Sequence, residues 1–568
     1  MIADAKRALS GPWPGRARLA AVGLFLLSLV AGLLVPVYTD EIGWRFQERA
    51  AVDHGIDVMY NDLCGPNSLG HPPWFMMPAR WYSALANQAF ADPWFVRVEG
   101  VLCALIWALL LLVLIARLEA DRDRRTRLQA LAFVLLSLGV QPFLMVMSRP
   151  EQPIMLAFTI SILLCLTRWR PAGWGEQAMA WITCAAIVVL VSIAQSYHLK
   201  GVLYAPVALV CLALCADGRR TLIPRGAGIV ALLAITLGSA RYWVGHLKCV
   251  AGDPQLAAHY ARENVASVLT GSHPGGGLAL QLVHGLNPFE YVVLAMANNR
   301  PMSEWLPPYL FSPAVLVPVD IGMLLVWLLA MWFGLRELAR FVRAEGWRAV
   351  MQPRVPIALA IIGCIMAWGA SQLKRNDYEA AHVLPMLVLF CVLCLSLPRR
   401  AGAGGDHPLT GRFVGGFVSW AVGFMVIGQI TVLAHVLPPL VAAAQVPGYL
   451  DAQRFSVSIG GYGKVRRDIA QAMRQSGISA EPALHRVLID DVTYLALQKS
   501  TLPLHRLGVL EAWNDGIDDP VAYLISRDSS GVVVGCRYLP PRMRAAATRV
   551  GEICALSRAG LERIDAPD

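Results

Sequence analysis

Long runs of apolar residues recur along the whole chain. A bilayer leaves no water for exposed backbone groups, so a segment that crosses it as a single chain must be helical. Such a helix needs roughly 20 apolar residues. The pattern therefore predicts about eleven transmembrane helices. The runs lie at about 19–37, 95–116, 128–147, 152–167, 178–195, 202–216, 227–245, 314–335, 355–372, 381–397 and 413–438.

The segments between these runs alternate in charge. One set, together with the N-terminus, holds about 22 lysines and arginines, whereas the short segments of the other set hold about four. Basic residues near transmembrane helices stay on the cytoplasmic side. The alternation therefore predicts a cytoplasmic N-terminus and, after eleven spans, an extracytoplasmic C-terminus.

Three long segments then fall outside the cytoplasm, at about 38–93, 246–313 and 439–568. The last has an ordinary globular composition. RRDIAQAMRQ has the pattern of a helix, and HRVLIDD and VVVGCRYL have the pattern of strands. We therefore expect a membrane domain over 1–438 and a small α/β or α+β domain over 439–568.

Overall composition agrees with a protein solvated by lipid. Hydrophobic residues make up 56% of the chain and charged residues 15%, against roughly 25% charged in soluble domains. The net charge of +10 does not indicate nucleic-acid binding, because the basic residues gather on one side of the predicted membrane. Among the twelve cysteines, Cys536 and Cys554 stand out because they lie in the polar C-terminal part. We expect Cys536 in a strand and Cys554 in a helix, either bonded to each other or buried as free thiols.

Two adjacent carboxylates, Asp40 and Glu41, follow the first apolar run. Acids at the edge of a membrane are costly unless they are paired or functional. Thr39 or Asp40 could instead cap the helical segment IGWRFQERAAV. The side chains of neighbouring helical residues point in different directions, so the two acids are expected to have different roles.

Further charged residues reach the same outer face. Glu151 begins the fourth run after MSRP, Lys200 lies in SYHLKG, and Lys374 and Arg375 lie in SQLKRNDYE. Glu151 could simply be a first-turn acid, and the cations could be snorkelling anchors. Together, however, carboxylates can take a proton from a hydroxyl, and cations can hold a phosphate.

These residues occur in an ordered set of short motifs that resembles the GT-C superfamily of integral-membrane glycosyltransferases. The resemblance is to the bacterial branch related to protein O-mannosyltransferases and the lipid A aminoarabinose transferase. The motifs are DE (Asp40, Glu41), HPP (His71, Pro72, Pro73), RPE (Arg149, Glu151), LKG (Lys200, Gly201) and KRNDYEAAHVLP (Lys374, Arg375, Tyr378).

The resemblance implies an enzyme of the bacterial inner membrane that inverts the sugar of a polyprenyl-phosphate donor. The acceptor would be a glycan, lipid or protein of the cell envelope. Asp40 would be the general base, and Glu41 or Glu151 would orient the acceptor or a metal. The aminoarabinose transferases have lysine where this chain has His71, and the family often has aspartate where it has Glu151. Some branches use a divalent metal ion and others do not, and the residues leave both options open.

Two other classes of protein compete with this reading. Transporters and flippases carry charges near the bilayer midplane and often contain repeats. Here the acids lie at helix ends and no repeat is visible, which favours an enzyme. A non-catalytic envelope assembly protein is the third possibility, and it would tolerate the loss of Asp40.

Overall fold

The structure is a computed structural model of the protein. It describes residues 13–38, 41–42, 45, 74, 77, 81, 85, 92–167, 175–250, 287–296, 313–371, 379–398, 412–446, 456–478, 487–497, 504–506, 519–526 and 529–565.

Each of the eleven predicted apolar runs contains a long or medium helix. Between them lie the short helices α8 (Gln141–Met145), α11 (Leu199–Leu203) and α17 (Phe289–Leu294). The eleven helices are α2 (Trp13–Gly32), α6 (Pro93–Leu118), α7 (Arg122–Ser137), α9 (Glu151–Thr167), α10 (Glu176–Tyr197), α12 (Ala205–Leu214), α13 (Leu222–Val250), α19 (Pro313–Glu345), α20 (Arg354–Ser371), α21 (Ala380–Leu395) and α22 (Arg412–Gln445).

Length and hydropathy place ten of these eleven helices in two groups, and α7 belongs to neither. Six segments of the described chain are long and apolar enough to cross a bilayer, and they belong to α2, α6, α10, α13, α19 and α22. The helices α9, α12, α20 and α21 are apolar but shorter. The protein is therefore a multi-pass integral membrane protein. The finer prediction of eleven crossings stays a prediction.

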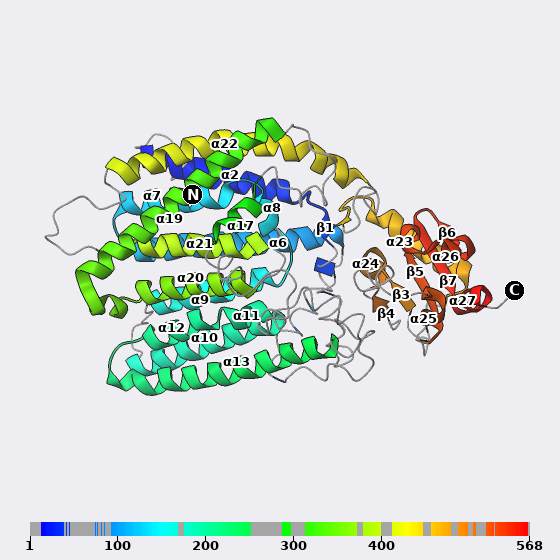
Figure 1. The fold of residues 1–568 in the computed structure, drawn as a ribbon, viewed down its shortest axis with the longest axis horizontal. Helices are drawn as coiled ribbons and strands as arrows, with labels where there is room; N and C mark the ends of the chain where they lie inside the picture. The colour runs from blue at the N-terminus through cyan, green and yellow to red at the C-terminus, as the bar shows by residue number, and fades with distance from the viewer. Residues whose placement is uncertain are drawn as a thin grey trace.

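The long helices lie roughly parallel to one another, and a smaller domain lies beyond one end of the bundle (Figure 1). Helix α21 occupies the interior, because all of its residues are buried. It packs against α19, α20 and α7. The N-terminal end of this central helix is where the charged residues described below converge.

The C-terminal domain is built around a five-stranded mixed sheet with the order β4-β3-β5-β7-β6. Strand β3 is parallel to β4 and β5, and β7 is antiparallel to β5 and β6. The predicted α/β or α+β class is thus confirmed as a small mixed sheet with helices. The strands are β3 (Val487–Ile489), β4 (Leu504–Arg506), β5 (Gly531–Gly535), β6 (Thr548–Val550) and β7 (Ile553–Ser557), and the helices are α23 (Tyr462–Ser476), α24 (Asp491–Leu497), α25 (Pro520–Ser526), α26 (Pro541–Ala546) and α27 (Arg558–Asp565).

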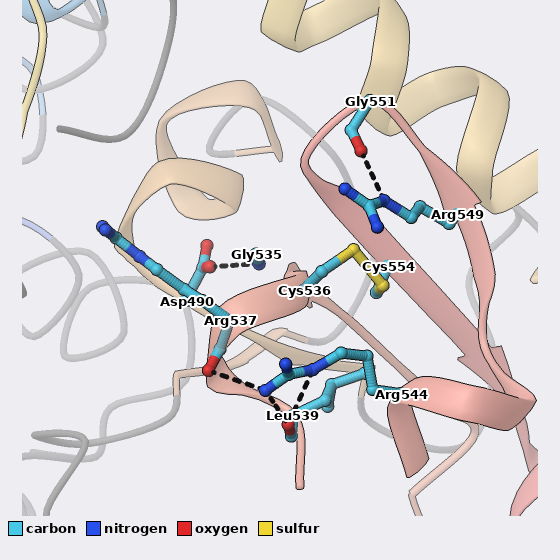
Figure 2. The surroundings of a disulfide bond; sticks show 9 residues. All are labelled: Asp490, Gly535, Cys536, Arg537, Leu539, Arg544, Arg549, Gly551 and Cys554. Carbon is cyan, nitrogen blue, oxygen red and sulfur yellow. Dashed lines mark hydrogen bonds between the residues drawn. A yellow bond between two sulfur atoms is a disulfide. The ribbon is translucent and has the colours of Figure 1, made fainter. Parts of the chain in front are cut away.

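A disulfide joins Cys536, directly after β5, to Cys554 in β7 (Figure 2). The two Cα atoms are 4.8 Å apart. The sequence placed Cys554 in a helix, and this is wrong: residues 553–557 pair with β5 and β6 as a strand. The alternation of a strand and the turns of a helix are hard to separate in a segment this short.

A second, two-stranded sheet connects the C-terminal domain to the membrane helices. Strand β1 (Val37–Tyr38), just after α2, pairs antiparallel with β2 (Ser456–Val457). Val37, Ile42 and Val96 pack into the same apolar cluster as the residues of α23. Helix α22 runs on to Gln445, past the boundary predicted at residue 438. The division into two domains at that boundary stays a prediction.

Candidate functional site

The predicted site residues fall into two groups. Glu41, Arg149, Glu151 and Lys200 lie in the described part of the chain, and all four are buried. The other predicted residues lie outside the described residues, so their assignments stay predictions. They are Asp40, His71, Lys374, Arg375 and Tyr378.

Glu41 forms a bidentate ion pair with Arg97 of α6, and both side chains are fully buried. The carboxylate of Glu41 also accepts hydrogen bonds from the backbone N–H groups of Tyr38 and Ser148, at 2.8 and 2.6 Å. Both of its oxygens are therefore engaged. This arrangement favours a structural role for Glu41, and its assignment to catalysis stays a prediction.

Arg97 extends the same network to the backbone. Its guanidinium donates to the carbonyl oxygens of Val35, Pro36 and Val146 at 2.7, 2.8 and 2.8 Å. The close approach of Val146 depends on Gly100, because a Cβ there would overlap the Val146 carbonyl. Planar guanidinium groups suit such multiple contacts. We call Glu41, Arg97 and these backbone partners the Glu41 network.

A second cluster forms where three helices begin. Glu151 is the first residue of α9, Lys200 lies in α11, and Glu379 immediately precedes α21. The ammonium of Lys200 pairs with the carboxylates of Glu151 and Glu379, at 3.0 Å in the second case. All three side chains are at least 96% buried. We call these three residues, together with Arg149 and His382, the Glu151 cluster.

Arg149 gives the Glu151 cluster a second cation. Its Nε lies 3.2 Å from Glu151 Oε2, and its guanidinium lies 6.0 Å from the centre of the Tyr38 ring. Ser148 beside it belongs to the Glu41 network. The short segment 148–151 therefore connects the two groups of charges, and it places the Glu151 cluster next to the chain that leads to Asp40.

The indole of Trp368 and the imidazole of His198 fix the position of Lys200. The indole N–H of Trp368 donates to Glu379 at 3.1 Å, and the Lys200 ammonium lies 5.2 Å from the Trp368 ring. His198 Nδ1 accepts the backbone N–H of Lys200 at 3.0 Å. Burial, helped by the nearby positive charge of Lys200, lowers the pKa of His198 to about 3. His198 is therefore neutral at physiological pH and keeps the lone pair that this hydrogen bond requires.

His382 completes a possible set of metal ligands. One ligand atom each of Glu151, Glu379 and His382 lies within 4.8 Å of the others, and no other such group occurs among the described residues. The His382 side chain is fully buried, and neither ring nitrogen has a hydrogen-bond partner. Its Nδ1 is 3.7 Å from Glu379 Oε2. Carboxylates and imidazole are ordinary ligands of Zn²⁺ and Mn²⁺.

The sequence reading missed three of these residues. Arg97 lies in PWFVRVEG, where a cation on the less basic face of the membrane was a visible signal. Glu379 and His382 lie within KRNDYEAAHVLP, where the basic residues and the tyrosine carry the resemblance. The partners of Arg97 and Glu379, which are Glu41 and Lys200, lie 56 and 179 positions away in the chain, so spacing alone could not reveal these contacts.

No protein-family model matches the chain, and no curated protein matches it significantly. The fold is similar to that of solved oligosaccharyltransferase structures from Archaeoglobus fulgidus. For the archaeal oligosaccharyltransferase AglB, in complex with an inhibitory peptide and a dolichol-phosphate, the identity is 12%, the TM-score is 0.41, and the match covers 91% of this chain and 69% of that one. For the A. fulgidus oligosaccharyltransferase complex with Zn and sulfate, the corresponding values are 12%, 0.38, 90% and 68%. At these values neither similarity identifies a family or an activity.

Proposed function

We propose that the protein transfers a sugar from a polyprenyl-phosphate-linked donor to an acceptor outside the cytoplasm, with inversion at the anomeric carbon. The acceptor is a glycan, lipid or protein of the cell envelope. The observation that carries the proposal is the Glu151 cluster. It gathers two cations and two carboxylates at the ends of membrane helices, and Arg149 and the adjacent Ser148 contact Tyr38 and Glu41, which flank Asp40 in the sequence.

Each component has a part in this chemistry. Sugar transfer from a phosphate needs neutralisation of the negative charge on the leaving group, which fixed cations provide. Arg149 and Lys200 supply that charge, and charge-assisted contacts to phosphate are among the stronger hydrogen bonds. His71, Lys374, Arg375 and Tyr378 are proposed to complete the donor site on the motifs alone.

The acceptor hydroxyl is a weak nucleophile at neutral pH, so a carboxylate must remove its proton. Glu41 is held by Arg97 and two backbone N–H groups, and Glu151 is held by two cations. A carboxylate stabilised in its charged form in this way is a poor base. These contacts leave Asp40 as the proposed general base.

The orientation of the protein is part of the proposal. The charge asymmetry of the loops favours a C-terminal domain outside the cytoplasm. The Cys536–Cys554 disulfide supports the same side, because such bonds persist in oxidising compartments. We expect alkaline phosphatase fused to the C-terminus to be active. We also expect both cysteines to resist alkylation until they are reduced. An inactive fusion, or ready alkylation of both thiols in the folded domain, would place the domain in the cytoplasm.

The decisive experiment replaces Asp40 with asparagine. Because a positioned general base accelerates such steps roughly 100- to 10,000-fold, Asp40→Asn should lower transfer by that factor while the protein still folds and inserts. Transfer is measured by mass spectrometry of glycans and glycolipids formed by the purified protein from a defined polyprenyl-phosphate sugar.

Asp92→Asn is the matched control. Asp92 caps α6 through a bond to the backbone N–H of Trp94, and asparagine is an equally good cap. The control should therefore transfer at the wild-type rate. Undiminished transfer by Asp40→Asn would move the base to another carboxylate. A wild-type protein that moves lipid-linked sugar across the membrane but forms no product would instead be a flippase.

A further inference from the structure

The Glu151 cluster contains the ligand types of a divalent metal site. Glu151, Glu379 and His382 come from two helix beginnings that meet in the interior, and their ligand atoms lie within 4.8 Å of one another. His382 is fully buried, neither ring nitrogen makes a hydrogen bond, and Nδ1 lies 3.7 Å from Glu379 Oε2. A buried imidazole without a hydrogen bond is costly, so its presence beside two carboxylates indicates a site built for a cation.

A cation already sits between the two carboxylates. The Lys200 ammonium contacts Glu151 and Glu379 at once, and only 2% of the Lys200 side chain is exposed. The backbone around Lys200 is also fixed, through the bond from its N–H to His198. The ammonium is therefore a positioned group and not a flexible surface charge.

The charges of the cluster favour lysine over a metal. Arg149 and Lys200 balance Glu151 and Glu379, so the cluster is neutral as it stands. A divalent ion added to it would face the ammonium and the guanidinium at contact distance, with few water molecules to screen the repulsion. It could bind only after Lys200 had withdrawn from both carboxylates.

We propose that Lys200 is the resident cation of a site whose remaining ligands are those of a divalent metal ion. The wild-type protein then binds no divalent ion at Glu151, Glu379 and His382, and removal of the ammonium exposes a working metal site. The consequence for transfer rests on the proposed function: the reaction would run without added metal because Lys200 exchanges one of its two carboxylate partners for the donor phosphate.

The test is Mn²⁺ binding to the full-length protein in detergent, followed by electron paramagnetic resonance of free and bound Mn²⁺. The compared proteins are the wild type, Lys200→Met, and Lys200→Met combined with His382→Leu. Methionine keeps much of the length of lysine and removes the charge. Lys200→Met should bind one Mn²⁺ roughly 100-fold or more tightly than the wild type. Loss of the imidazole in the double variant should weaken that binding by at least about 10-fold.

Lys464→Met is the matched control. Lys464 pairs with Asp468 on an exposed face of α23, so its loss should leave Mn²⁺ binding as in the wild type. Wild-type protein that binds Mn²⁺ tightly, and loses it on Glu379→Gln, would overturn the proposal. A folded Lys200→Met that binds no Mn²⁺ would do the same.

The wild-type titration decides the central claim even if Lys200→Met does not fold. If the wild type binds no Mn²⁺ at this site, the claim that lysine occupies it is supported. The measurement uses neither donor nor acceptor. A failure to detect sugar transfer would therefore count against the proposed function and leave the assignment of the resident cation intact.

Discussion

The Glu41 network and the Glu151 cluster lie side by side, yet they are built differently. In the Glu41 network, Arg97 and Glu41 bond to each other and to backbone groups of two separate segments, 35–38 and 146–148. In the Glu151 cluster, the bonds described for Glu151 and Glu379 all come from other side chains. Ser148 belongs to the first group and Arg149, its neighbour, to the second.

This difference favours a structural role for the Glu41 network and supports the chemical role proposed for the Glu151 cluster. Contacts to the backbone cannot be exchanged without moving the chain, so the Glu41 network fixes how α2, α6 and α8 meet. Side chains that bond to one another can change partners by rotating, and a phosphate or a hydroxyl can replace one of them. The same low dielectric makes both groups costly to break. The Glu151 cluster, however, retains alternative partners and an unpartnered imidazole.

The largest effect on stability is expected from Arg97→Leu. This change leaves Glu41 buried without a counter-charge and removes partners from three backbone carbonyls, so it should cost about 3–5 kcal/mol. The measurement is unfolding of the purified protein in detergent. Arg340→Leu is the control, because its ion pair with Glu337 is half exposed and should contribute about 1 kcal/mol or less. Equal losses of stability in the two variants would show that the buried Glu41 network stabilises the fold no more than the exposed pair of Arg340 and Glu337.

A smaller effect is expected from Glu379→Gln. The variant takes a charged acceptor from Lys200 and Trp368, but Lys200 keeps its bond to Glu151. The cost in the same unfolding assay should therefore be about 1–3 kcal/mol, the value of a hydrogen bond to a charged group. A loss of stability as large as that of Arg97→Leu would mean that the remaining bond to Glu151 does not compensate Lys200 for the loss of Glu379.

The smallest effect is expected from His382→Leu in the otherwise wild-type protein. Neither ring nitrogen has a hydrogen-bond partner, so leucine removes a buried unsatisfied group. Stability should change by less than about 1 kcal/mol or rise slightly. A clear loss of stability would show that the imidazole takes part in a bond that holds the fold, and would place His382 with the Glu41 network.

Several elements of this structure could be predicted from the sequence because their causes are local. A run of apolar residues without charges becomes a helix wherever water is absent, and the eleven runs did so. The segment RRDIAQAMRQ lies in α23, and HRVLIDD contains β3. By contrast, Cys554 was placed in a helix, because its strand character comes from pairing with β5 and β6.

The sequence predicted some residues of the candidate site but not the contacts among them. Glu151 and Lys200 were found because charged residues near apolar runs are conspicuous, but each was expected to face a substrate. In the structure they face each other and Glu379. No local rule indicates that the beginnings of α9, α11 and α21 meet, because that contact depends on how the helices pack.

By itself, the sequence determined that this chain enters a membrane many times and that a small mixed domain follows. Those features depend on composition and on local hydrogen bonding. Only the tertiary structure decided that Arg97 binds Glu41, that Lys200 lies between two carboxylates, and that β1 pairs with β2 across more than 400 residues. Such contacts join residues that packing alone brings together, and their energy depends on burial that no segment has until the whole chain is folded.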